Sequence, residues 1–144
     1  LAIVSALATS LILWSLTVGD LGARARAGAE LNTSGRFALQ IITRDLEQAT
    51  AVIVPASTTP SPTLTLTNAL GQAVDISISG GQLIRTVAAG SPLPLTTLPA
   101  TVTNFTVVRT TGPWSARVSL SVSLTLRALP APARSFTTAV NLRR

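Results

Sequence analysis

The first eighteen residues of the chain carry no charge. Leu1 to Val18 reads LAIVSALATSLILWSLTV, in which only small hydroxyl residues interrupt the apolar ones. As a helix this segment would rise about 27 Å, slightly less than the roughly 30 Å hydrocarbon core of a membrane. We therefore expect a helix that lies in a dry environment and continues upstream of Leu1. The residues expected to pack in lipid or against other helices are Leu1, Ile3, Val4, Leu7, Leu11, Ile12, Trp14, Leu16 and Val18.

Two other interpretations of this segment stay open. Ala23-Arg24-Ala25 fits the small-residue cleavage site of a signal peptide, although no basic region precedes the apolar run. The second interpretation is a core helix that is buried on all sides, and such helices are rare in a protein of this size. An interfacial anchor is one interpretation of Trp14.

Residues 19 to 54 predict an amphipathic continuation of the helix, ended by Pro55. Asp20 with Arg24, and Arg26 with Glu30, have the i,i+4 spacing of surface ion pairs. Four glycines lower helix propensity, so we expect the middle of the helix to be its weakest part and open to partial unwinding. They are Gly19, Gly22, Gly28 and Gly35. The apolar stripe consists of Leu31, Gly35, Ala38, Leu39, Ile42, Leu46, Ala49 and Ile53.

After the Pro-rich segment 55–62, the apolar period changes from 3.6 to 2, which is typical of half-buried strands. The clearest case is Arg117 to Arg127, where apolar residues alternate with Ser and Thr. Further strands are predicted around Leu64 to Leu66 and Val74 to Ile78, and over Gln82 to Val87, Val102 to Thr110 and Ser135 to Leu142. Gly80-Gly81 predicts a two-residue hairpin turn, and Gly112-Pro113 a second turn.

An antiparallel sheet with one apolar face needs a cover, and the amphipathic helix supplies one. The sequence therefore predicts an α+β fold, with an N-terminal helix over 1–54 and a β-rich head over 55–144. Within the helix, 1–18 is the membrane or filament-core segment and 19–54 the amphipathic half. The residues expected in the core between helix and sheet are Leu31, Leu39, Ile42, Leu46, Val118, Leu120, Val122 and Leu124.

The composition argues against an enzyme. The chain has no Cys, His, Lys, Tyr or Met, and Asp75 is the only acid after residue 54. A Ser-His-Asp or Ser-Lys arrangement, a carboxylate pair within the head and a His or Cys metal site are therefore excluded. We expect no catalytic residue, no cofactor and no metal ion.

The net charge of +6 comes from the head, where seven Arg follow residue 54 and Asp75 alone opposes them. Arginines can neutralise phosphates, so DNA is one partner to consider. Only 3% of the residues are aromatic and the Arg are dispersed, which favours a solvated polar surface over a nucleic-acid platform.

The order of elements resembles type IV pilins and the pseudopilins of type II secretion. The segment Gly35 to Ala49, GRFALQIITRDLEQA, is similar to the helix of PilW-type minor pilins and J-type minor pseudopilins. Phe136 to Arg144, FTTAVNLRR, resembles their closing strand, with Arg144 where the family has Asn. Leu1 to Ser5 looks like the middle of the processed N-terminal segment, so the family's early glutamate and cleavage motif would lie upstream.

The resemblance implies a structural subunit, more similar to minor than to major pilins. It would wait in the inner membrane with a periplasmic head, and an assembly machinery would then move its helix into a filament of pilin or pseudopilin subunits at the cell surface. The alternative is a membrane-anchored periplasmic or surface β-domain that binds a ligand or partner without forming filaments.

Overall fold

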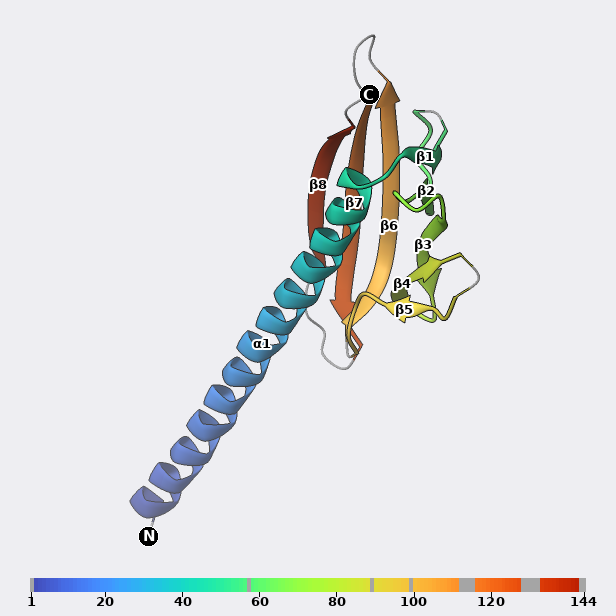
Figure 1. The fold of residues 1–144 in the computed structure, drawn as a ribbon. Helices are drawn as coiled ribbons and strands as arrows, with labels where there is room; N and C mark the ends of the chain where they lie inside the picture. Colours follow the sequence, from blue (N-terminus) through green and yellow to red (C-terminus); the bar gives the residue numbers. More distant parts are fainter. Residues whose placement is uncertain are drawn as a thin grey trace.

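The computed structural model describes residues 2–56, 58–88, 90–98, 100–111, 116–127 and 133–142, with side chains from residue 13 onward. Over these residues, one helix, α1 (Ala2–Glu47), is 46 residues long and leads into eight strands. Its C-terminal half lies on the β-rich head, and its N-terminal half extends away from it (Figure 1). The predicted α+β class, a long helix packed on antiparallel sheet, is confirmed.

The helix ends earlier than predicted. It stops at Glu47, and Ala51–Val54 forms strand β1 in place of a last helical turn. The predicted stripe position Ile53 is therefore half-exposed on a strand. The segment from Thr50 to Val54 contains four β-branched residues, which favour a strand over a helix end.

The four glycines do not interrupt α1, so the partial unwinding expected there is absent from the described helix. Gly35 instead serves close packing. A Cβ atom built on Gly35 would lie 2.6 Å from Cδ2 and 2.8 Å from Cζ of the Phe136 ring. Only a glycine lets this ring approach the helix backbone so closely.

The strands divide between two antiparallel sheets, where the sequence had suggested one. The first sheet has the order β1-β2-β3-β4-β5, with β1 as above, β2 (Leu64–Thr67), β3 (Ala73–Ser79), β4 (Gln82–Val87) and β5 (Leu93–Pro94). The predicted hairpin at Gly80-Gly81 is confirmed: it joins β3 to β4 with φ angles of 58° and 77°, as a type I′ turn requires. The two-residue β5 ends in Pro94, which cannot donate to a further ladder.

The second sheet has the order β6-β7-β8, with β6 (Ala100–Thr111), β7 (Ala116–Leu126) and β8 (Arg134–Leu142). Two backbone contacts link β6 to the first sheet and its loops. Ser61 and Val107 form an isolated β-bridge, and the Val102 N–H donates to the Gly81 carbonyl at 2.8 Å. The predicted turn at Gly112-Pro113 lies outside the described residues.

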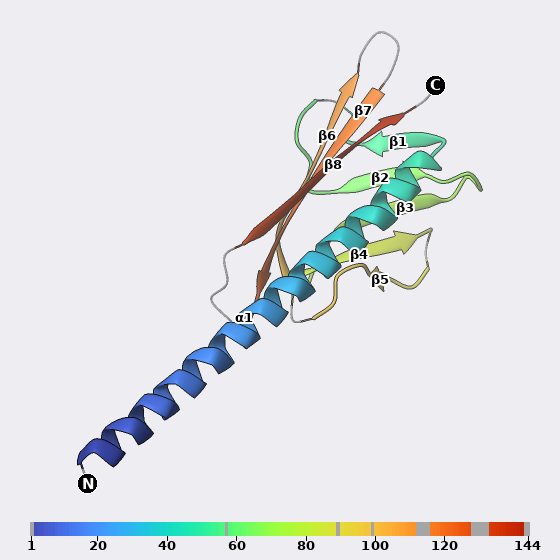
Figure 2. The ribbon, with the colours of Figure 1, turned by 90° about the vertical axis from the view of Figure 1, so that its left-hand side faces the viewer.

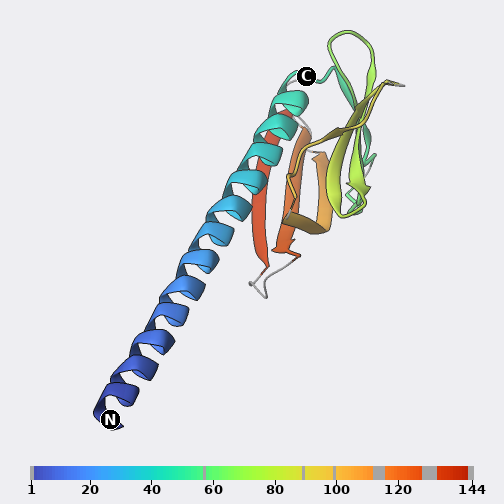
Figure 3. The same cartoon turned by 90° about the horizontal axis from the view of Figure 1, so that it is seen from below.

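One continuous core joins α1 to both sheets. The helix runs along the second sheet and packs against β8 and β7. The first sheet lies beside the second sheet, next to β6 (Figures 2 and 3). Phe105 is the largest fully buried side chain, and apolar residues of β2, β3 and β4 complete the core. The head therefore holds about half of α1 and leaves the other half outside.

Candidate functional site: the projecting helix and its attachment

The N-terminal half of α1 projects from the head without covering contacts in the described structure. Every residue from Leu13 to Arg26 is exposed, and Ala27 is the first buried residue among the helix side chains that are described. The segment from Ala2 to Arg26 would span about 37 Å at 1.5 Å per residue. We call this segment the rod (Figure 1).

Large apolar side chains of the rod face solvent. Leu13, Trp14 and Leu16 are 65%, 68% and 64% exposed, and Leu21 is 61% exposed. Val18 is also exposed, so five large apolar residues lie exposed within nine residues of one helix. Isolated exposed apolar residues are common on proteins, but five this close together form a patch. Such a patch is typical of a surface that is covered by another molecule or by lipid.

The residues predicted to pack in a membrane or filament core fall into two groups. Trp14, Leu16 and Val18 are exposed on the rod. The others lie outside the residues whose side chains are described: Leu1, Ile3, Val4, Leu7, Leu11 and Ile12. Within the described part of the chain, no helix meets the length and hydropathy needed to cross a membrane.

The residues predicted for the helix-sheet core lie where α1 packs on the head. Leu39 is half-buried and packs against the core from a shallow groove between α1 and β8 that Arg36 and Arg44 also line. The remaining seven are at most 1% exposed: Leu31, Ile42, Leu46, Val118, Leu120, Val122 and Leu124.

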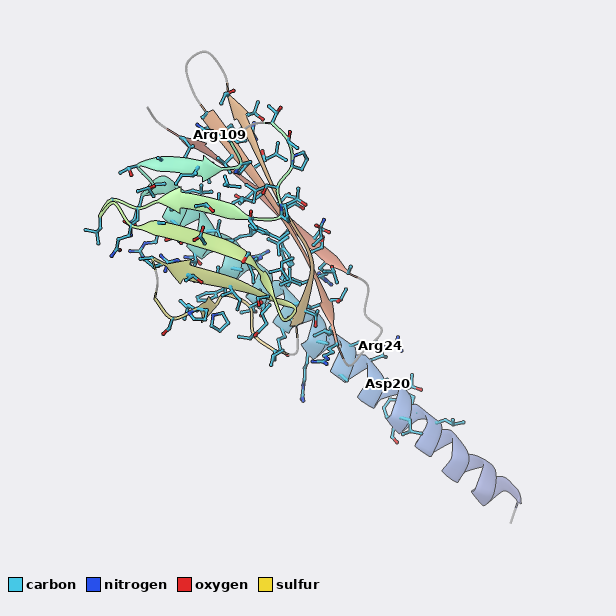
Figure 4. The ribbon with its side chains drawn as sticks, turned by 90° about the vertical axis from the view of Figure 1, so that its right-hand side faces the viewer. Asp20, Arg24 and Arg109 are labelled. Carbon is cyan, nitrogen blue, oxygen red and sulfur yellow. The ribbon has the colours of Figure 1, made fainter. Side chains whose placement is uncertain are left out.

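Charged side chains begin on the rod close to the head. Asp20 and Arg24 lie on the exposed helix next to each other (Figure 4), but no ion pair joins them, and none joins Arg26 to Glu30 among the described residues. The predicted i,i+4 pairs are therefore wrong. Exposed charges in water gain little from pairing, since each long side chain must lose rotamer freedom to do so.

A different ion pair fixes the helix to the first sheet. Arg85 on β4 donates from Nε to Asp45 Oδ2 at 2.6 Å and from Nη2 to Oδ1 at 3.0 Å. The two side chains are 23% and 14% exposed. Hydrogen bonding to Asp45, opposed by burial and aided by the charge of Asp45, raises the pKa of Arg85. This link holds the last turn of α1 against the head.

Sequence reasoning missed this pair, although a signal was present. Asp45 follows Ala38 by seven residues and Ile42 by three, so it belongs to the buried stripe of the helix. A carboxylate at such a position needs a cation from the facing element. Arg85 lies on the same inward-facing side of β4 as Leu83. That Arg85 is the partner of Asp45 could be recognised only once the position of β4 in the sheet was known.

A second polar contact lies closer to the rod. The buried Ser34 hydroxyl and the Thr97 hydroxyl are 2.7 Å apart, which joins α1 to the connection between β5 and β6. Together with Gly35 against Phe136, it fixes the helix at several points along its head-bound half. The rod therefore leaves the head in a defined direction.

The five described arginines of the head are dispersed over different parts of it. Arg85 is engaged by Asp45, and Arg109 donates to the Val52 carbonyl inside the head. Arg117, Arg127 and Arg134 are exposed on the second sheet and its ends, and Arg143 and Arg144 lie outside the described residues. Among the described residues, no three acidic side chains come close enough to hold a metal ion.

Comparisons with protein-family models, with curated proteins and with solved structures find no match to this chain.

Proposed function

We propose that this chain is a structural subunit, of the minor type, of a type IV pilus or a type II secretion-like filament. Its rod packs among the rods of other subunits, and its head faces outward. Before assembly the rod lies in the inner membrane with the head in the periplasm, and an assembly machinery transfers it to the filament. The observation that carries this proposal is the projecting helix with exposed Leu13, Trp14, Leu16 and Leu21.

The apolar patch on the rod favours a dry environment over water. Burial of apolar surface contributes about 25 cal/mol per Å², so a rod with this patch is driven toward any dry surroundings. Lipid and the rods of other copies both satisfy that demand. A helix that can exchange one for the other is what an assembling filament subunit needs.

Firm attachment of the rod supports the same function. A filament requires every subunit to hold its head at a fixed angle to its rod, because small angular errors accumulate along the assembly. The Asp45–Arg85 pair, the Ser34–Thr97 contact and the Gly35–Phe136 packing restrict that angle. A simple membrane anchor has no such need.

The resemblance of Gly35 to Ala49 and of the closing strand to minor pilins adds to this argument. Both segments lie where they would act together, since Phe136 on β8 packs onto Gly35 of α1. DNA binding is not part of the proposal, because the described arginines are dispersed or engaged inside the head.

The experiment compares two charge substitutions in cells that express the full chain. Leu16→Asp places a carboxylate on the rod, and Leu70→Asp places one on an 81% exposed position of the head, between β2 and β3. We expect wild type and Leu70→Asp in the filament fraction sheared from cells. Leu16→Asp should be absent from that fraction, while the purified full chain in detergent keeps the wild-type denaturation midpoint.

The alternative function gives a different result with the same samples. A membrane-anchored monomer would stay in the membrane fraction even as wild type, and shearing would release none of it. Recovery of the wild-type chain only from membranes would therefore contradict the filament proposal.

A further inference from the structure

The edge strands of the two sheets differ in how they are protected. Unpaired edges tend to pair with other chains, and proteins block them with short strands, prolines, irregular pairing or covering segments. β1 has four residues and a shifted register with β2, and β5 has two residues and ends in Pro94. Along the outer edge of β6, backbone groups of Ser61 and Gly81 bond to Val107 and Val102. Three of the four edges are therefore protected.

β8 is the fourth edge, and the described structure leaves it open. Its nine residues pair with β7 in one unbroken register, without a proline or a bulge. In an antiparallel ladder, every second residue directs its N–H and C=O away from the neighbouring strand. Among the described residues, no backbone hydrogen bond joins these outward groups of β8 to another segment, and no described element lies on its outer side (Figures 1 and 2). An edge of this length can accept one more strand.

A cationic groove runs beside this open edge. It has a volume of about 640 Å³ and lies between α1 and β8. Thr137 and Thr138 of β8 line one wall, and Arg36 and Arg44 of α1 line the other, with Glu47 as the one acid of the lining. Both arginines are exposed, and neither forms an ion pair within the described part of the chain. Side chains of an added strand that face α1 would therefore meet two guanidinium groups without a carboxylate partner.

The spacing of the two arginines matches that of an extended strand. Arg36 and Arg44 lie eight residues apart on one helix, which corresponds to about 12 Å along its axis. In a strand, residues i and i+4 point to the same side and lie about 13 Å apart. An added strand with acidic residues four positions apart thus places one carboxylate beside each guanidinium.

The strands of this chain do not supply such a segment. Four of its five acidic residues lie on α1. The fifth, Asp75, lies on β3 in the interior of the first sheet and accepts a hydrogen bond from the Thr65 hydroxyl at 2.6 Å. The charge of the groove therefore favours a strand from a different protein over a strand from a second copy.

We propose that the β8 edge binds an extended acidic segment of a different protein as an added strand. The backbone of the segment pairs with the outward N–H and C=O groups of β8, and its acids at positions i and i+4 accept hydrogen bonds from Arg36 and Arg44. This surface lies where the head holds α1, so its binding goes beyond rod packing and does not require it.

The test uses a nine-residue peptide of Thr and Val with Glu at positions 3 and 7, added to the full chain in a non-ionic detergent. Hydrogen exchange of the backbone amides, followed by NMR, reports whether a strand forms on β8. We expect the outward amides of β8 to exchange at least about tenfold more slowly with saturating peptide, while the amides of β1 keep their rates. The dissociation constant should be on the order of 0.1 to 1 mM, as weak single-site binding allows.

Two control peptides separate the charge from the backbone pairing. A peptide with Gln at positions 3 and 7 keeps the shape and loses both carboxylates, so it should bind about fivefold more weakly, as the loss of two exposed ion pairs allows. A peptide with Glu at positions 3 and 6 keeps the charge but places the two acids on opposite faces of the strand. It should also bind more weakly than the first peptide.

Two double variants identify the arginines. Arg36→Gln with Arg44→Gln should weaken binding of the Glu peptide about fivefold and leave binding of the Gln peptide unchanged, because both changes remove the same contacts. The matched control, Arg24→Gln with Arg26→Gln, removes two exposed arginines of the rod and should bind both peptides like wild type.

Three results overturn the proposal. The first is β8 amides that keep their exchange rates in 5 mM Glu peptide, about five times the weakest dissociation constant expected. The second is equal binding of the Glu and Gln peptides to wild type. The third is protection of the β8 amides that develops as the chain alone is concentrated, which would assign the edge to a second copy. None of these readouts depends on filament assembly, so a failure here is distinguishable from a failure of the filament proposal.

Discussion

Arg85 holds the Asp45 carboxylate with two hydrogen bonds of 2.6 and 3.0 Å, across a sequence separation of forty residues. This pair joins the last turn of α1 to β4 of the first sheet, and neither side chain is more than 23% exposed. Together with the Ser34–Thr97 contact and the Gly35–Phe136 packing, it restricts the orientation of the projecting helix relative to the head.

Loss of this pair should destabilise the head. We expect Arg85→Gln to lower the free energy of unfolding by about 2 kcal/mol, because Asp45 then keeps a partly buried charge without its partner. Arg117→Gln, which removes an exposed arginine of β7, should cost at most about 0.5 kcal/mol. Denaturant unfolding of both variants measures the difference, and equal costs would argue against the link.

The pair should also be insensitive to pH through the neutral range. Asp45 raises the pKa of Arg85 in the folded protein, so this contribution is complete below the ordinary pKa of arginine and is lost only as the pH rises through the raised value. The stability gap between wild type and Arg85→Gln should therefore stay constant from about pH 6 to about pH 10. A gap that closes within this interval would require another titrating group.

Gly35 and Gly22 should respond to alanine with opposite signs. Alanine normally favours a helix by up to about 1 kcal/mol over glycine. At Gly35 the new methyl group meets the Phe136 ring, so we expect a loss of about 1 to 3 kcal/mol. Gly22 has open space around it, so Gly22→Ala should raise helix content without lowering head stability.

A double variant identifies the cause of the Gly35 effect. Gly35→Ala combined with Phe136→Leu should recover part of the lost stability, since the smaller side chain leaves room for the methyl group. If Gly35→Ala alone is neutral in denaturant unfolding, the close packing of α1 on β8 is contradicted.

The end of α1 at Glu47 can be tested by comparing two isoleucines, one on the helix and one beyond it. Ile42 is fully buried on α1, whereas Ile53 is 50% exposed on β1. Ile42→Ala should cost about 2 to 5 kcal/mol, as core truncations do, and Ile53→Ala about 1 kcal/mol or less. Similar large losses at both positions would restore the longer helix that the sequence had suggested.

Much of the fold followed from periodicity. Alternating Ser and apolar residues predicted β7 to within one residue at each end, and Gly80-Gly81 predicted the β3–β4 hairpin. These signals are local, so the sequence contains them fully. The end of α1 was harder, because Ala49 and Ile53 continue the helical spacing while the β-branched run from Thr50 favours a strand.

The contacts that shape the candidate site are long-range and could not be predicted. Asp45 and Arg85, Ser34 and Thr97, and Arg109 and Val52 meet only because two sheets pack around one helix. From the sequence, all arginines of the head counted equally toward its net positive charge. In the structure, Arg85 and Arg109 face inward and make hydrogen bonds inside the protein. Because side chains alternate between the two faces of a strand, the sequence can indicate which arginines face inward. Their hydrogen-bond partners depend on tertiary packing, which the sequence does not show.

The most direct test of the central claim, that the rod packs against other rods, uses the absence of cysteine from the chain. Leu16→Cys and Leu70→Cys each introduce one thiol, on the rod and on the head. In filaments sheared from expressing cells and treated with a short thiol cross-linker, Leu16→Cys should give covalent links between subunits and Leu70→Cys should stay uncrosslinked. No cross-linked product from Leu16→Cys, with the chain found only as a monomer in membranes, would contradict the account.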